Sequence, residues 1–163
     1  MHPNEKLIQQ FYTAFQDHNP AGMSSLYHKN IIFKDPAFGS IRGARAKSMW
    51  HMLIERSGSE LEVTFSDIQA DDYHGSAKWT ATYYYGPKKR KVVNHVVGVF
   101  SFQSGSIIQH NDYFDLYTWA KQALGLPGYL LGWTKYMQQK IQLKTSVMLS
   151  KYMQDHNLKE LKG

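Results

Sequence analysis

Residues 98–116 read GVFSFQSGSIIQHNDYFDL, and this stretch decides the predicted fold. Aromatic and β-branched residues alternate with small or polar ones on both sides of Gln103-Ser104-Gly105, which is typical of two antiparallel strands joined by a short turn. The second strand ends at Asp112 and Asp115, although aspartate is among the residue types depleted from strands. A carboxylate at position 112, among residues suited to a core, therefore needs a structural or functional reason.

The rest of the chain supplies the other elements of an α+β domain. Apolar spacing, the Asn19-Pro20 start signal and the alternating stretches predict helices at 3–18, 20–27 and 43–57, and strands at 31–34, 60–68, 76–86, 91–102 and 106–115. The connection GPKKRK is also of hairpin size. Helices followed by hairpin-linked strands predict a curved antiparallel sheet packed on N-terminal helices, rather than a doubly wound parallel sheet.

From residue 116 the pattern is helical again. Gly125 and Pro127 are stop signals, and one long helical stretch is predicted after them. Its imperfect apolar stripe consists of Leu130, Leu131, Tyr136, Met137, Ile141, Met148 and Tyr152. The stripe favours packing on the sheet or on a second subunit, and a membrane-surface helix is the alternative, since a basic amphipathic helix has the same signature. We therefore predict a domain at 1–125 and a C-terminal helical extension at 126–163.

Composition excludes several classes of function. The 163 residues contain no cysteine, which excludes disulfides, thiolate metal sites and cysteine nucleophiles. The histidines show no metal-ligand spacing, so no metal is predicted. The N-terminus MHPNEKLIQQ lacks an apolar signal core, and no apolar run is long enough to span a membrane, so we expect a soluble cytoplasmic protein without a membrane partner. The net charge of +6 is concentrated in GPKKRK and the tail without a recognition motif, so no nucleic-acid partner is expected.

Strand alternation places the polar residues on faces. His110 and Asp112 share one face of their strand, and Asn94 and Gly98 share one face of the neighbouring strand. These residues can therefore belong to one concave surface. Gly98 leaves space there, since a strand glycine often marks the close approach of a ligand.

Two stretches resemble a known superfamily. FKDPAFGSIRG (33–43) resembles the segment that carries the general base of steroid Δ-isomerases, and residues 98–116 resemble the last hairpin of limonene-1,2-epoxide hydrolase and SnoaL-like polyketide cyclases. All of these belong to the nuclear transport factor 2-like superfamily. The resemblance covers roughly residues 4–125. It implies a cone-shaped hydrophobic pocket, a commonly homodimeric assembly and chemistry without a cofactor.

The resemblance also implies site residues. Asp35 falls where the isomerase places its proton-abstracting aspartate. The positions that hold the isomerase's oxyanion donors are occupied in this chain by Phe11 and Gly98, which cannot donate from a side chain. Asp112 falls where the hydrolase and the cyclases place a catalytic aspartate. The hydrolase's second aspartate and its bridging arginine, in contrast, correspond to Thr80 and Lys78. Neither the isomerase mechanism nor the hydrolase mechanism carries over intact to this chain. The catalytic groups that the resemblance still implies are the carboxylates of Asp35 and Asp112.

The sequence leaves two main classes of function open, with a peripheral membrane module that uses the basic tail as a less favoured third class. In the first, Asp112 or Asp35 abstracts a proton or activates a water, and His110 acts as the acid or oxygen-holding donor, in an isomerase, cyclase or hydrolase acting on a small hydrophobic carbonyl or epoxide compound. In the second, the pocket binds a hydrophobic ligand or a protein without catalysis. The predicted ligand-binding residues are Asn94, Phe11, Tyr12, Phe15, Phe114 and Trp79. Structural alternatives are a strand-ending turn at Asp35 and a hydrogen-bonded strand histidine at His110.

Overall fold

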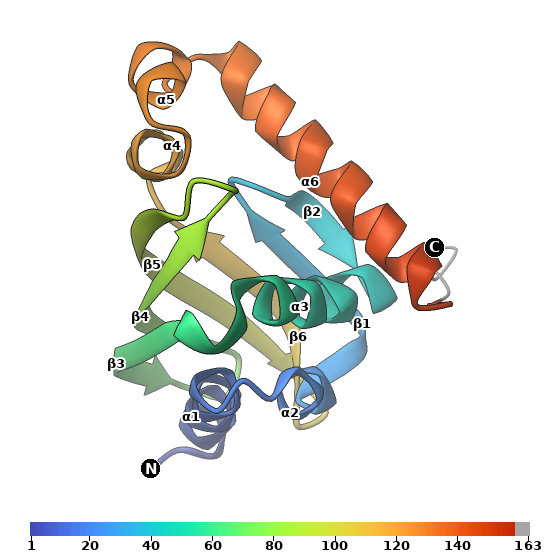
Figure 1. The fold of residues 1–163 in the computed structure, drawn as a ribbon. Coiled ribbons are helices and arrows are strands. Elements are labelled where there is room, and N and C mark those ends of the chain that lie inside the picture. Colours follow the sequence, from blue (N-terminus) through green and yellow to red (C-terminus); the bar gives the residue numbers. More distant parts are fainter. Residues whose placement is uncertain (159–163) are drawn as a thin grey trace.

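The computed structural model describes residues 1–158. Its central element is a curved six-stranded sheet (Figure 1). The strands are β1 (Tyr27–Asp35), β2 (Gly39–Arg42), β3 (Glu62–Ala70), β4 (His74–Tyr85), β5 (Arg90–Gln103) and β6 (Ser106–Tyr113). They lie in the order β2-β1-β6-β5-β4-β3. The four predicted longer strands are confirmed as neighbours joined by hairpins, because short connections leave antiparallel pairing as the available arrangement.

One edge of the sheet differs from the prediction. β2 was not predicted, and β1 pairs with β6 in parallel, so the sheet is mixed rather than wholly antiparallel. A parallel pair needs a long crossover connection, and nearly all of the domain lies between β1 and β6 in the sequence. The β1–β6 register pairs Lys34 with Asn111, so Asp35 and Asp112, each one residue further on, lie at the same end of the two strands.

Three helices precede or interrupt the strands: α1 (Pro3–Gln16), α2 (Pro20–Ser25) and α3 (Ala44–Ser57), the last followed by a short 3-10 turn η1 (Gly58–Glu60). The predicted start of α2 is confirmed, since the side chain of Asn19 accepts the backbone N–H of Gly22 at 3.0 Å. α1 buries its predicted apolar face, with Phe11 and Tyr12 fully enclosed. The main hydrophobic core therefore lies between the helices and the sheet.

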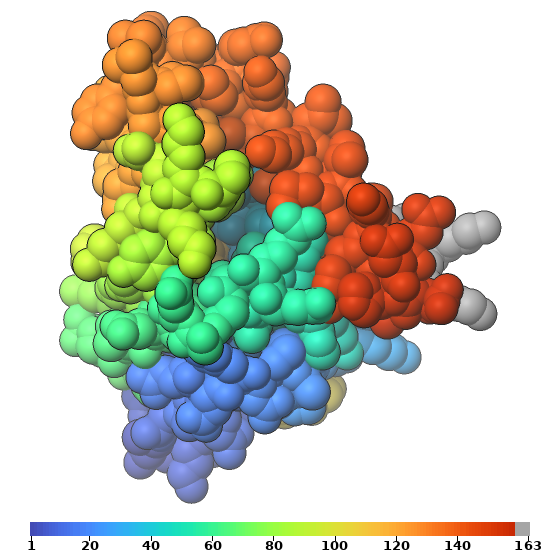
Figure 2. Space-filling view, in the orientation of Figure 1, coloured from blue at the N-terminus to red at the C-terminus, as the bar shows by residue number. Residues whose placement is uncertain are grey.

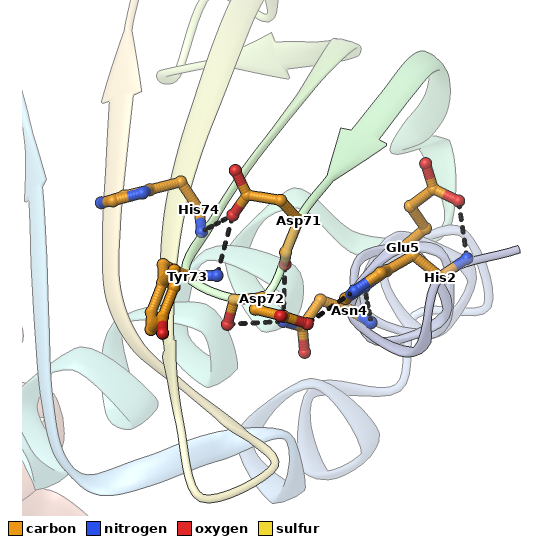
Figure 3. Close-up of polar contacts among 7 residues, drawn as sticks. All are labelled: His2, Asn4, Glu5, Asp71, Asp72, Tyr73 and His74. Atoms are coloured by element: carbon orange, nitrogen blue, oxygen red, sulfur yellow. Dashed lines mark hydrogen bonds and ion pairs between the residues drawn. The ribbon is translucent and has the colours of Figure 1, made fainter.

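The N-terminal end of α1 is attached to the β3–β4 turn (Figure 3). The Asn4 side chain donates to the backbone carbonyls of Asp71 and Asp72 at 2.9 and 3.2 Å, and Nε2 of His2 lies 3.0 Å from Oδ1 of Asp72. Asp71 accepts the backbone N–H groups of His74 and Tyr73, which lower the pKa of its carboxyl. These contacts hold α1 in place against the sheet.

The tail forms three helices: α4 (Leu116–Leu124), α5 (Leu126–Leu131) and α6 (Lys135–Asp155). The single long helix predicted after Pro127 is wrong, because Thr134 begins a new helix by accepting the backbone N–H of Met137 at 3.2 Å. α6 crosses the open end of the sheet, where Gln142 and Thr145 donate to the backbone carbonyls of Pro36 and Ala37 at 3.0 and 2.8 Å.

The predicted apolar stripe of the tail is only partly buried. Met137 and Ile141 face the protein, whereas Leu130, Leu131 and Tyr136 are exposed. None of the helices within residues 1–158 is long and apolar enough to cross a membrane. The division at residue 125 and the homodimer stay predictions, and residues 159–163 of the predicted extension lie outside the described residues.

Candidate active site

A cavity of about 750 Å³ opens between the concave face of the sheet, α3 and α6. Figure 2 shows its hollow mouth between the end of β4, α3 and α6. Small-molecule sites have volumes of this order. Its wall contains many apolar side chains, among them Phe15, Trp50, Trp79, Tyr83, Phe114, Trp119, Met137, Ile141 and Met148, and its carboxylates are Asp35 and Asp112. The cavity therefore suits an apolar compound that presents a few polar atoms.

Asp112 borders this cavity and is held by two donors. Its Oδ1 lies 2.8 Å from Nε2 of His110 and 3.3 Å from Nε1 of Trp79. Asp112 is only 3% exposed. Its second oxygen, Oδ2, accepts no hydrogen bond from a described residue and is not enclosed by protein, so it is the oxygen that reaches the cavity.

Behind Asp112 a buried chain of hydrogen bonds runs into the core. Nδ1 of His110 lies 2.7 Å from the Tyr27 hydroxyl, to which Nε1 of Trp50 donates at 2.8 Å. Trp50 can only donate, so all these atoms are satisfied if the Tyr27 hydroxyl donates to Nδ1 and Nε2–H of His110 donates to an ionised Asp112. Burial raises the pKa of Tyr27 well above its usual value and keeps that hydroxyl protonated. The network therefore fixes the His110 ring and the Asp112 carboxyl in one orientation.

Aromatic rings enclose the His110 imidazole, which is fully buried. Phe100 stacks on it with ring centroids 4.3 Å apart, and the rings of Phe11 and Phe33 meet it edge-on at 5.3 and 5.2 Å. Phe11 therefore contacts the His110 ring from the core and does not line the cavity. The enclosure keeps the His110 ring away from the cavity, whereas Asp112 lines it and can touch a ligand.

Asp35 is the second carboxylate of the cavity, and it also forms the predicted strand-ending turn. Its Oδ1 accepts the backbone N–H groups of Ala37 and Phe38 at 2.9 and 2.6 Å. Burial raises its pKa to about 7; the Phe38 and Ala37 N–H groups oppose this shift, and the charge of Asp112 adds to it. Asp35 is partly exposed and lines the cavity. Near neutral pH it therefore exists in both protonation states.

The structure brings together some of the predicted ligand-binding residues. Asn94, Phe15, Phe114 and Trp79 line the cavity with both carboxylates. Phe11 and Tyr12 are core residues outside the cavity wall, and His110 lies behind Asp112. Their roles in binding or catalysis stay predictions. Within residues 1–158 no group of three or more His, Asp or Glu side chains could hold a metal ion.

Gly98 provides the space that Tyr12 and Asp112 need. It pairs with Asp112 across β5 and β6. A Cβ atom at this position would lie 2.5 Å from the Tyr12 hydroxyl and 3.2 Å from Oδ1 of Asp112. The Tyr12 hydroxyl is buried without a hydrogen-bond partner among the described residues, and burial raises its pKa well above the usual value. The glycine therefore accommodates a neutral hydroxyl beside the carboxylate.

Gly98→Ala is expected to lower the free energy of unfolding by about 1–3 kcal/mol, since the added methyl overpacks a rigid core. Tyr12→Phe should by itself be neutral or stabilising, because it removes an unpartnered buried hydroxyl. In the Tyr12→Phe background the alanine should cost clearly less. Urea unfolding of the two single variants and the double variant measures this. An equal loss in both backgrounds would show that Tyr12 is not what Gly98 accommodates.

A curved sheet that encloses a cavity with a buried acid–histidine pair defines an α+β pocket protein of the nuclear transport factor 2-like type. Residues 8–110 match the family model described as a SnoaL-like domain. The chain belongs to this family, and its superfamily is the one that the sequence resemblance indicated. No curated protein sequence matches the chain.

Solved structures share the fold at low sequence identity. TerC, co-crystallised with polyporic acid, has a TM-score of 0.64 and 14% identity over 74% of this chain and 98% of that chain. An epoxide hydrolase of M. tuberculosis similar to limonene epoxide hydrolase has a TM-score of 0.58 and 24% identity over 75% and 90%. A putative polyketide cyclase from Xanthomonas campestris pv. campestris has a TM-score of 0.58 and 17% identity over 72% and 93%. At these identities the likeness establishes the fold alone.

Tyr27 and Trp50 were not predicted as site residues, and the predicted end of the helix at residue 27 is wrong, because Tyr27 begins β1. The α6 residues Met137, Ile141 and Met148 were predicted only as part of an apolar stripe. Tyr27 lies 83 residues before His110, and no local pattern connects the two.

Proposed function

We propose that the cavity is the active site of an isomerase- or cyclase-type enzyme that moves protons on an apolar carbonyl compound. The observation that carries this proposal is that two carboxylates in different environments border one apolar cavity. Oδ1 of Asp112 is held by donors from His110 and Trp79, whereas burial raises the pKa of Asp35 to about 7. Two carboxyl groups in different environments can supply a base and an acid at the same pH.

The proposed step uses the free oxygen of Asp112. Oδ2 takes a proton from the carbon next to the substrate carbonyl, and the electron pair of that C–H bond forms the enol double bond. The carbonyl oxygen receives the proton of neutral Asp35, with Asn94 near it as a polar side chain of the wall. His110 and Tyr27 are positioning residues, because they hold Asp112 from the buried side and do not line the cavity. Trp50 supports the Tyr27 hydroxyl and also lines the cavity wall.

The comparisons support this class of substrate. TerC was co-crystallised with polyporic acid, and SalBIII is described as an epoxide hydrolase/cyclase-like enzyme in pyran ring formation. The aromatic side chains that line this cavity suit ring compounds of that kind. Epoxide hydrolysis is the alternative reaction. In that reaction Asp112 would take a proton from a water molecule instead of from a carbon atom of the substrate.

Deuterium exchange tests the proposal directly. A panel of quinones, polyketide-like diketones, steroids and terpenoid epoxides is first screened for binding by thermal shift, and each binder is then incubated with the protein in D2O. Enzyme-dependent incorporation of deuterium next to the carbonyl supports proton abstraction even when net turnover is slow. Binders that show neither exchange nor chemical conversion would contradict catalysis and favour a binding protein, for which the extensive apolar wall is the supporting observation.

The rate of exchange is expected to fall with rising pH above about 7, because Asp35 then loses the proton that it donates. Asp35→Asn should lower the rate and flatten this alkaline limb, since asparagine accepts the same backbone N–H groups but has no proton to transfer. The test is to measure the deuterium-exchange rate of the wild type and of Asp35→Asn between pH 5 and pH 9. A wild-type profile that rises through this range would exclude Asp35 as the acid.

A further inference from the structure

The short helix α5 presents its large side chains to solvent. Gly128 and Gly132 form its inner side: a Cβ at Gly128 would collide with the Ala120 carbonyl, and one at Gly132 would lie 2.9 Å from Cβ of Ala120. This close packing on α4 turns the leucines and the tryptophan outward. Leu126, Leu130 and Trp133 are 71%, 62% and 66% exposed.

α6 continues this surface because it is apolar on two opposite sides. Met137, Ile141, Leu149 and Met153 are buried on the inner side. Tyr136, Leu143 and Val147 are 67%, 68% and 61% exposed, and at about 100° per residue they lie within about 40° of one another on the outer side. Among residues 1–158, no other element covers the outer side of α6 in Figure 1. We call Leu126, Leu130, Trp133, Tyr136, Leu143 and Val147 the outer apolar surface.

The charged residues between Asp115 and Asp155 have a single sign. Residues 116–154 contain five lysines and no aspartate or glutamate. Lys140 and Lys144 lie beside the outer stripe of α6, at about 40° and 80° from Tyr136. Neither forms an ion pair with any residue of the described part of the chain. The surface is therefore apolar and aromatic with a positive edge.

We propose that the outer apolar surface docks on an anionic phospholipid bilayer. Tryptophan and tyrosine favour the interface between lipid and water, and a basic edge is attracted to anionic headgroups. A second copy of this chain fits less well, because a two-fold contact would bring lysines against lysines. The sequence left a membrane-surface helix as the less favoured alternative for the tail, because it does not show which apolar residues of the tail are buried.

The cavity mouth lies beside the proposed docking surface. Lys140 and Lys144 border both the outer stripe of α6 and the cavity. Docking would therefore place the mouth near the bilayer, where an apolar compound concentrates. The inference does not depend on the catalytic proposal, because a pocket that only binds an apolar ligand would gain the same access.

Co-sedimentation with vesicles tests the docking. The wild type is expected to bind vesicles of phosphatidylcholine mixed with phosphatidylserine at least about tenfold more tightly than vesicles of phosphatidylcholine alone, and the binding should weaken with salt. Trp133→Ser/Leu143→Ser should reduce it at least about tenfold. The matched control is Tyr73→Ser, which removes an exposed aromatic side chain from the β3–β4 turn at the opposite end of the molecule; it should bind as the wild type does.

Charge variants separate the two contributions. Lys140→Gln/Lys144→Gln should weaken binding to the anionic vesicles, whereas Lys6→Gln/Lys29→Gln, on α1 and β1, should not. Circular dichroism melts confirm that each variant is folded. No binding to anionic vesicles at low salt would overturn the proposal, and so would equal binding by wild type and Trp133→Ser/Leu143→Ser. A wild-type dimer that the same double variant converts to a monomer, without vesicle binding, would assign the surface to a second copy instead.

Discussion

Asp112→Asn is expected to lower the rate of deuterium exchange into a bound carbonyl compound by about 10²–10⁴-fold, the range typical for loss of a general base. Asparagine has the same shape as aspartate. Its Oδ1 can still accept from Nε2 of His110 and Nε1 of Trp79, so the buried network keeps its geometry. What disappears is the basic oxygen on the cavity side. Affinity for an unreactive analogue should therefore remain within about threefold of the wild type, since only a contact that strengthens in the transition state is lost.

The matched control for this variant is Asp115→Asn. Asp115 begins α4 by accepting the backbone N–H of Tyr117 at 3.0 Å, is exposed, and does not line the cavity. Its substitution removes the same charge three residues away and should leave the exchange rate unchanged. Exchange in Asp112→Asn at the wild-type rate, with the variant folded, would remove Asp112 from the proposed chemistry and leave the cavity as a binding site.

The sequence predicted the hairpins of the sheet well because their signals are local. Alternation and the turns GPKKRK and Gln103–Gly105 specify β4, β5 and β6, and the strand parity of Asp112 correctly predicts its inward direction. The β1–β6 pairing has no such signal. It joins segments separated by nearly the whole domain, and their relative direction is set by packing rather than by a turn.

The candidate site was predictable where strand faces place a residue, as for Asp112 and Asn94, or where the family resemblance does, as for Asp35. Asp112, Asp35 and Asn94 were predicted to share a cavity, and all three line it. The support of His110 was not predictable, because Tyr27 and Trp50 come from distant parts of the chain and meet only after folding. Phe11 and Tyr12 were assigned to the pocket wall from resemblance, whereas α1 carries them into the core beneath it.

Asp35→Asn is expected to have a higher free energy of unfolding than the wild type at alkaline pH. The difference between the two proteins should be about 2–3 kcal/mol larger at pH 8 than at pH 5. The pKa of Asp35 rises from 3.8 to about 7 in the folded protein, chiefly because of burial. Between these values the folded state binds more protons than the unfolded state, so wild-type stability falls as the pH rises through this window. Asparagine keeps both backbone hydrogen bonds and cannot ionise. Urea unfolding of both proteins between pH 4 and pH 9 gives the difference in their free energies of unfolding. The pH dependence that other titratable groups contribute is common to both proteins and cancels in this difference.

The Asp112→Asn background tests the cause of this pH dependence. Because the charge of Asp112 is one of the factors that raise the pKa of Asp35, its removal should lower that pKa and narrow the pH window. The Asp35→Asn substitution should then yield a smaller gain at pH 8 than it does in the wild type. Such coupling requires the two carboxylates to lie close together in the folded protein, whether or not the cavity is catalytic. A stability difference between wild type and Asp35→Asn that stays constant from pH 5 to pH 8 would show that Asp35 ionises as freely in the folded chain as in the unfolded one.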